Sequence, residues 1–140
     1  MSSPMNIRFG ERVRGSLEQF AHRTGQPKSR VVNTAVSEWL AAQAHPRVRF
    51  MTIETGERRA TLTDGPQVWT IAAAWQSHPD ALRNVETVAD ALGLPPSAVT
   101  ASLAYWADYR DEIDGILERH RAAQDDALAA WERLQALQQG

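Results

Sequence analysis

The sequence predicts a mainly α-helical protein in which an N-terminal strand and two helices precede a β-hairpin and a small helical domain that ends in a long C-terminal helix. Two observations carry this prediction. Apolar side chains recur at helical spacing over most of the 140 residues, and two short β-leaning runs flank a turn-forming stretch after residue 47. We therefore divide the chain into segments 1–46, 47–121 and 122–140.

The first 25 residues are predicted to form a strand and then a helix. A strand is expected at residues 5–9, because Met5, Ile7 and Phe9 alternate with other side chains. After Gly10 the apolar residues follow helical spacing at Val13, Leu17, Phe20 and Ala21. Gly25 suits the left-handed position that ends a helix, so we expect this helix to stop at Thr24.

A second helix is predicted between Ser29, a good N-cap residue, and His45-Pro46, which cannot continue a helix. Its apolar face consists of Val32, Ala35, Val36, Trp39 and Leu40. One strand and two short helices cannot bury these side chains, and a lone strand has no partner for its backbone groups. The sequence therefore predicts a homodimer whose two strands pair as an antiparallel ribbon.

The outward face of this ribbon would carry Asn6 and Arg8, whose side chains suit base edges in the DNA major groove. The charge distribution agrees with a polyanionic partner. Residues 1–50 hold eight basic and three acidic side chains (net +5), whereas residues 51–140 hold seven basic and fourteen acidic ones (net −7). Two blander explanations stay open: chance clustering of charge, and polar residues that only keep an exposed edge strand soluble.

The first 45 residues resemble the ribbon-helix-helix family that includes MetJ, Arc and CopG. The resemblance rests on Met5-Asn6-Ile7-Arg8-Phe9, followed by Leu17, Ala21, Thr24-Gly25, Ser29, Ala35 and Leu40. It implies base contacts from Asn6 and Arg8, and a third reading position at Pro4, where the family usually has a polar residue. It also implies that Lys28, Ser29 and Arg30 hold a DNA phosphate, which agrees with the attraction of helix N-termini for anions.

The middle segment is predicted to contain a β-hairpin and several helices. Runs at 48–53 and 58–62 flank a turn at 54–57, and helical spacing follows at 68–78, at 85–92 and from Ser97, the expected N-cap, to Leu117. The tight turn at 93–96 is typical of a helix-turn-helix, but the helix after it has no basic residue before Arg110. We therefore expect a structural or protein-binding unit, with DNA contact as the weaker alternative.

Residues 45–117 resemble a group of actinobacterial-type antitoxins that join a ribbon-helix-helix head to a small helix-turn-helix-like domain. The resemblance rests on His45-Pro46, Arg58-Arg59-Ala60, the stretches 64–69, 89–94 and 101–105, and Asp111-Glu112-Ile113-Asp114. Such antitoxins are usually paired with PIN-domain ribonuclease toxins. The resemblance therefore implies the antitoxin of a type II toxin-antitoxin system, which represses its own operon by binding double-stranded operator DNA and neutralises a cognate toxin.

The C-terminal segment is the predicted toxin-binding region. Its apolar stripe consists of Leu128, Trp131, Leu134 and Leu137, with Trp131 as the expected anchor. Because a PIN active site is a cluster of carboxylates, an inserted arginine would neutralise it; the candidates are Arg119, Arg121 and Arg133. We expect Gln124-Asp125-Asp126 to interrupt the helix and residues 122–140 to be poorly ordered without a partner. The alternative function is a free-standing ribbon-helix-helix repressor whose C-terminal region oligomerises or senses a ligand.

Other features limit the chemistry. The chain has no cysteine and its four histidines lie far apart, so we expect neither a metal site nor a cofactor. The carboxylates at 108, 111, 112, 114 and 118 lack a neighbouring nucleophile and suit the solvated face of a helix, so we do not expect an enzyme. With neither a signal peptide nor an apolar run long enough to cross a bilayer, we expect a cytoplasmic protein without membrane contact.

Overall fold

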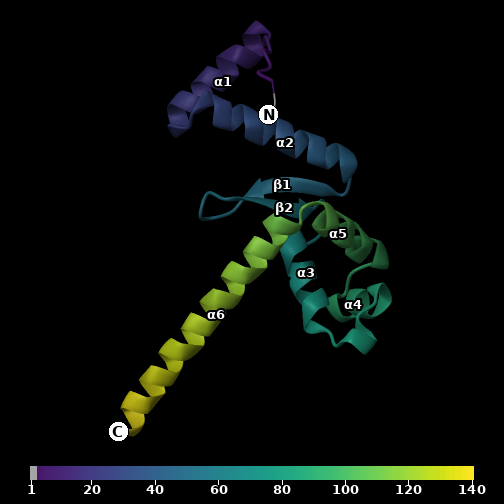
Figure 1. Ribbon diagram of the computed structural model, residues 1–140, viewed down its shortest axis with the longest axis vertical. Coiled ribbons are helices and arrows are strands. Elements are labelled where there is room, and N and C mark those ends of the chain that lie inside the picture. Colours follow the sequence, from purple (N-terminus) through teal and green to yellow (C-terminus); the bar gives the residue numbers. More distant parts are fainter. Residues whose placement is uncertain (1–2) are drawn as a thin grey trace. The chain divides into compact units, whose positions relative to one another are not determined.

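The computed structural model describes residues 3–140, so Met1 and Ser2 of the predicted segment 1–46 lie outside the described residues. The chain forms two compact units, which we name unit 1 (Met1–Gln43) and unit 2 (Ala44–Gly140). Figure 1 shows the helices of unit 1 in purple and blue, and unit 2 from the hairpin to the yellow C-terminal helix. Each unit is described by itself below.

Unit 1 contains two helices, α1 (Glu11–Thr24) and α2 (Lys28–Ala44), whose last residue belongs to unit 2. The predicted end of α1 is confirmed. Gly25 has a left-handed backbone conformation (φ 72°), and its N–H donates to the carbonyl oxygen of Ala21 at 2.9 Å. A side chain with a Cβ would be strained in this conformation, which explains the glycine at this position. The predicted end of α2 before His45-Pro46 is also confirmed.

The start of α2 differs from the prediction, because Ser29 is not its N-cap. The helix begins at Lys28, and the carbonyl oxygen of Pro27 accepts hydrogen bonds from the N–H groups of Arg30 and Val31. Pro27 thus holds the capping position through its carbonyl group, and its ring fixes φ near the value that a helix requires. Ser29 lies inside the first turn of the helix.

The strand predicted for residues 5–9 does not form in the single chain. Residues 3–10 have no regular secondary structure, and each of them is exposed. The prediction is wrong for the isolated chain because a strand needs a neighbour for its backbone N–H and C=O groups. The described residues of unit 1 contain no second strand that could serve as this neighbour.

The β-hairpin predicted for unit 2 is confirmed. Strand β1 (Val48–Thr52) pairs antiparallel with β2 (Arg58–Leu62), with Val48 opposite Leu62 and Thr52 opposite Arg58. Gly56 supplies a positive φ (89°) in the connecting turn. The hairpin buries Val48 and Leu62 at its open end, so this end joins the core of the unit.

The rest of unit 2 is helical, with α3 (Val68–Ser77), a 3₁₀ turn η1 (Asp80–Leu82), α4 (Val85–Leu92), α5 (Pro96–Asp108) and α6 (Arg110–Gln139). The helices predicted at 68–78 and 85–92 are confirmed. α4 has clear end signals: Asn84 Oδ1 accepts from the N–H of Thr87 at 2.9 Å, and Gly93 ends the helix with φ 69°. α3 contacts β2, α4, α5 and α6, so it lies at the centre of the unit (Figure 1).

The boundaries of α5 differ from the prediction at both ends. Pro96 is its first residue and Pro95 precedes it, so Ser97 lies in the first turn and is not the N-cap. Proline is favoured at the first helical position because an N–H group there would have no acceptor within the helix, so its absence costs no hydrogen bond. The helix expected to continue to Leu117 is broken at Tyr109 (φ −124°, ψ 51°), and α6 starts immediately after it.

α6 is a continuous helix of 30 residues, so the interruption predicted at Gln124-Asp125-Asp126 is wrong. Glutamine and aspartate are weaker helix formers than alanine, but neither breaks a helix. Arg121 and Asp125, one turn apart, form an ion pair at 3.9 Å that supports the helix at this point. The predicted long C-terminal helix is therefore confirmed, without the break.

The core of unit 2 lies where α3, α4, α5 and α6 meet the hairpin. Its largest fully buried side chains are Leu62, Val68, Ile71, Val88, Val99, Tyr105 and Ile113. Tyr105 keeps its polar end satisfied inside this core, because its hydroxyl group donates to Glu112 Oε2 at 2.8 Å. No helix in residues 3–140 combines the length and the apolar character that a membrane crossing requires.

Candidate functional site

The side chains predicted to contact DNA are all exposed on unit 1; they are Pro4, Asn6, Arg8, Lys28, Ser29 and Arg30. The structure brings Arg8, Lys28 and Ser29 together along one groove of about 670 Å³. Pro4, Asn6 and Arg30 lie outside its lining. The apolar part of the groove consists of Met5, Ile7, Phe9, Leu17 and Val32. This groove therefore combines cationic side chains with apolar ones from the N-terminal segment and both helices.

Glu18 also lines this groove and pairs with a cation from each helix. Its Oε1 lies 3.4 Å from Nε of Arg14, one turn earlier in α1, and 3.7 Å from Nζ of Lys28, the first residue of α2. Sequence analysis missed Glu18 as a site residue. The spacing of four residues from Arg14 indicates the first pair, whereas the second depends on how the two helices fold against each other.

The first turn of α2 has N–H groups that have no acceptor within the helix. Arg30 and Val31 donate to Pro27, whereas the N–H groups of Lys28 and Ser29 precede the first intrahelical bonds. These groups and the positive end of the helix dipole attract anions. Ser29 lies at the start of α2 as predicted although it does not cap the helix, and its contact with a phosphate stays a prediction.

Unit 1 leaves most of its large apolar side chains uncovered. Of residues 3–43, only Ala21 and Ala41 are buried. The exposed large apolar side chains of this unit are Met5, Ile7, Phe9, Val13, Phe20, Val36, Trp39 and Leu40. Trp39, with 62% of its surface exposed, is the clearest case in α2. So many exposed apolar side chains in so short a segment are typical of a surface that another chain covers.

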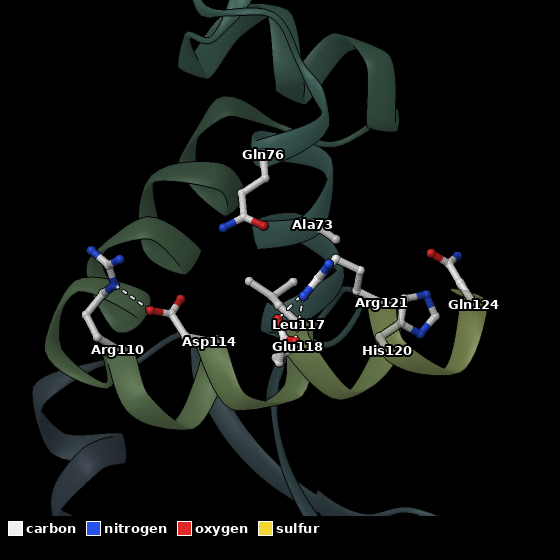
Figure 2. Close-up of a pocket in the computed structure, with 9 residues that line it drawn as sticks. All are labelled: Ala73, Gln76, Arg110, Asp114, Leu117, Glu118, His120, Arg121 and Gln124. Atoms are coloured by element: carbon white, nitrogen blue, oxygen red, sulfur yellow. Dashed lines mark hydrogen bonds and ion pairs between the residues drawn. The ribbon is translucent and has the colours of Figure 1, made fainter. Parts of the chain in front are cut away.

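A second groove, of about 370 Å³, lies between α3 and α6 of unit 2 (Figure 2). Its arginines already have partners: Arg110 Nε lies 3.2 Å from Asp114 Oδ2, and Arg121 Nη2 lies 2.6 Å from Glu118 Oε1. The hydrogen bonds that Arg121 donates to the carboxylate of Glu118 raise the pKa of Arg121 above its ordinary value. Within residues 3–140, no three His, Asp or Glu side chains gather as a metal site would require.

The pair α4 and α5, joined by the turn at Gly93, has a helix-turn-helix order, but α5 presents no cationic surface. Its exposed side chains are Pro96, Ser97, Thr100, Ala104, Ala107 and Asp108. The carboxylate of Asp108 is engaged, because its Oδ2 lies 2.7 Å from Nε2 of His45. α5 therefore offers DNA phosphates no basic side chain.

His45, at the start of unit 2, is held against the break between α5 and α6. Its side chain is only 9% exposed, and its ring meets the rings of Tyr105 and Tyr109 edge-on, with centroids 5.3 and 6.0 Å apart. Together with the contact to Asp108, these rings fix the segment that follows α2 to the α5–α6 corner. His45-Pro46 therefore has a packing role in addition to ending α2.

The C-terminal half of α6 extends away from α3, α4 and α5 (Figure 1). The stripe predicted to bind a partner is uncovered: the exposed fractions are 54% for Leu128, 57% for Trp131, 51% for Leu134 and 79% for Leu137. Trp131 and Leu134 follow the buried Ile113 and Ile116 by 18 residues, which is about five full turns. The helix face that packs into the core thus continues, without a partner in the described residues, along the projecting half.

The three candidate arginines of α6 differ in their surroundings. Arg119 Nη2 lies 3.0 Å from Glu57 Oε1 in the hairpin turn, and Arg121 pairs with Glu118 and Asp125. In both pairs the arginine side chain is more than half exposed, so breaking the pair costs little free energy. Within residues 3–140 no ion pair involves Arg133, which lies beside the uncovered stripe. Of the three candidate arginines, Arg133 is therefore the one for which pairing with a carboxylate of another protein would break no ion pair within residues 3–140.

Comparison of the chain with protein-family models, with curated proteins and with solved structures found no match. The function of the protein must therefore be argued from the two surfaces just described. They are the cationic and apolar groove of unit 1 and the uncovered stripe of α6.

Proposed function

We propose that the protein is a homodimeric DNA-binding repressor of the ribbon-helix-helix class that also neutralises a partner toxin, as the antitoxin of a type II system. The observation that carries this proposal is the composition of unit 1. Its apolar side chains are exposed in the single chain, and cationic side chains stand among them in one groove. A second copy would cover the first set and leave the second set free for DNA.

The proposed dimer is argued from the N-terminal segment, whose backbone groups lack strand partners and whose apolar side chains are exposed. Residues 3–10 are exposed and without regular structure, although Met5, Ile7 and Phe9 alternate as in a half-buried strand. The same segment of a second chain supplies the missing backbone partners when the two pair antiparallel about a twofold axis. The paired strands would turn these apolar side chains towards α1 and α2, where they would form a shared core and leave the cationic side chains of the groove exposed.

DNA binding follows from the side chains that the ribbon leaves outside. Asn6 and Arg8 would be presented twice on a two-stranded ribbon, which fits the major groove. Lys28, Ser29 and Arg30 at the start of α2 would hold the flanking phosphates. Pro4 cannot donate a hydrogen bond, so its contact with DNA is at most apolar.

Toxin binding follows from the uncovered half of α6. An amphipathic helix that binds an apolar groove presents anchors about three or four residues apart, as Leu128, Trp131 and Leu134 do. Trp131 would be the main anchor, and Arg133 would reach acidic side chains at the rim, such as the carboxylate cluster of a PIN ribonuclease. Arg119 and Arg121 are secondary, because each has a carboxylate partner in unit 2.

The test is coexpression of the chain with the neighbouring open reading frame, together with gel-shift binding to the DNA upstream of its own reading frame. Truncation after Arg121 and Trp131→Ala should abolish rescue of growth and keep DNA binding, whereas Gln139→Ala, the control on the same helix, should keep both. Arg8→Ala should keep rescue and lose sequence preference. Rescue by the truncated chain would move the toxin site into residues 44–121, and absence of any toxic neighbour would favour a free-standing repressor.

A further inference from the structure

The carboxylate of Glu18 occupies a position between two cations of the unit 1 groove. Arg14 and Lys28 approach the same oxygen, Oε1, at 3.4 and 3.7 Å. Ser29, whose N–H is unused by α2, lines the same groove. An external anion that binds Lys28 must therefore displace the carboxylate of Glu18 from the lysine.

The ion pairs of Glu18 with Arg14 and Lys28 are exposed, so a DNA phosphate can replace the carboxylate at these cations. The exposed side-chain fractions are 48% for Glu18, 60% for Lys28 and 74% for Arg14, so water and salt screen both contacts. Ion pairs of this kind contribute little to stability. A phosphate oxygen makes the same contacts with Lys28 and Arg14 and brings the charge of a polyanion with it. The two exposed ion pairs are the polar contacts that the structure gives the carboxylate of Glu18 within residues 3–140.

We propose that Glu18 is an internal competitor for DNA phosphate that weakens the DNA binding of unit 1 and reduces its salt dependence. This inference rests on the proposed DNA-binding function. When DNA binds, phosphate replaces the carboxylate at Lys28, and Glu18 keeps Arg14 as its partner. Glu18 then still neutralises part of the positive charge of the site, so fewer counterions are released from DNA and the salt dependence of binding is less steep than the cationic residues alone would give.

The experiment compares the full-length protein with Glu18→Gln on a mixed-sequence duplex of about 30 base pairs, by fluorescence anisotropy from about 50 to 200 mM salt. Such a probe suits phosphate contacts, which do not depend on sequence. Glu18→Gln should bind on the order of tenfold more tightly as a dimer at the lowest salt. Its plot of log affinity against log salt should be steeper by about one unit per protomer.

The matched control is Glu11→Gln, which removes the same charge from the same helix. No ion pair involves Glu11 within residues 3–140, so this variant reports the change in net charge together with the small effect of an acid in the first turn of α1. Equal affinities and slopes for the two variants would overturn the inference, as would weaker binding by Glu18→Gln, which would make Glu18 a residue that positions Lys28. If neither the wild type nor Glu18→Gln binds the duplex at about 50 mM salt, the DNA-binding function fails and the inference with it.

A double-mutant cycle locates the effect at the lysine. In a Lys28→Gln background the carboxylate has lost the partner that phosphate would take, so the added Glu18→Gln change should improve binding less than twofold. A full gain in that background would overturn competition at Lys28. Circular dichroism and sedimentation of each variant show whether the fold and the dimer are unchanged, because a merely structural role of Glu18 would alter these and not the salt slope.

Discussion

Unit 1 and unit 2 treat their apolar side chains in opposite ways. Unit 2 surrounds α3 with a hairpin and three further helices, so Leu62, Ile71 and Tyr105 are almost completely buried. Unit 1 has only two helices and an irregular N-terminal segment, and it leaves Val36 and Trp39 largely exposed. Unit 2 therefore has a core of its own, whereas unit 1 buries too few side chains to enclose one, and the proposed dimer predicts that unit 1 is stable only when a second chain covers it.

The two units also differ in what their charged side chains do. In unit 2, Arg59 and Arg119 share Glu57, and the hairpin turn is thereby tied to α6. In unit 1, no ion pair involves Arg8 or Arg30 within residues 3–43. Cations that have an internal partner support the fold, and cations without one are available to an external anion. Unit 2 therefore uses Arg59 and Arg119 within its own structure, whereas Arg8 and Arg30 of unit 1 have no ion pair among the described residues.

The largest effect is expected from the core of unit 2. Ile71 is fully buried in α3, so Ile71→Ala should lower the free energy of unfolding of unit 2 by about 2–5 kcal/mol. Urea unfolding followed by circular dichroism should show this loss equally at all protein concentrations. A loss that shrinks as the protein concentration rises would mean that unit 2 also needs a second chain, which would break the comparison.

A comparable effect is expected in unit 1 from a side chain that the single chain exposes. Val36→Asp should disrupt the dimer and cost about 2–4 kcal/mol in association, because the carboxylate would be buried in the dimer core. Ser37→Asp, on the next residue and also exposed, is the control and should change little. Sedimentation at several concentrations measures both. A dimer unaffected by Val36→Asp would leave unit 1 a monomer with an exposed apolar surface.

Features that depend on neighbouring residues were predictable from the sequence. Gly25 ends α1 because left-handed backbone is open to glycine, and residues 48–62 form a hairpin because turn residues separate two β-leaning runs. The stripe at Leu128, Trp131 and Leu134 was predicted from spacing, and its exposure agrees with the expectation that nothing else in the chain covers it.

Features that depend on competition or on distant residues were not predictable. Serine is a good cap, but Pro27 and Pro96 move the starts of α2 and α5, so neither Ser29 nor Ser97 is an N-cap. The break at Tyr109 follows from packing around the α5–α6 corner, which no local pattern encodes. The contact of Glu18 with Lys28 likewise exists only once α1 and α2 have folded against each other.

A smaller effect is expected from Glu57, which tests whether ion pairs stabilise unit 2. Arg59 is mostly buried and bonds to Glu57 at 2.9 Å; this hydrogen bond holds the pKa of Glu57 below its ordinary value of 4.5. The stabilisation is therefore present above that value and is lost as the pH falls through the lower pKa of the folded state. Glu57→Gln should cost about 1 kcal/mol at neutral pH, because Glu57 is 40% exposed and solvent screens it.

The pH dependence provides the control for this variant. Urea unfolding of the wild type and of Glu57→Gln should give free energies that converge as the pH falls below the lowered pKa of Glu57 in the folded state, where the carboxyl group of the wild type is protonated. A difference that stays constant with pH would attribute the loss to packing and not to the charge. Arg59→Lys, which keeps a charge but lacks the planar fork, should lose part of the same stabilisation.

The smallest effect is expected from Trp131 in the free protein. Its ring is 57% exposed on the projecting half of α6, so Trp131→Ala should change the free energy of unfolding by less than about 0.5 kcal/mol. Trp69, which packs on His120 with ring centroids 4.7 Å apart, is the control, and Trp69→Ala should cost several times more.

Urea unfolding at two protein concentrations separates two possible failures of this prediction. A concentration-independent loss above about 2 kcal/mol would mean that the tail folds back on its own chain, whereas a loss that appears only at high concentration would mean that a second copy covers it. Either result would mean that the stripe is covered in the free protein, so the proposed toxin would have to compete for a face that is already occupied.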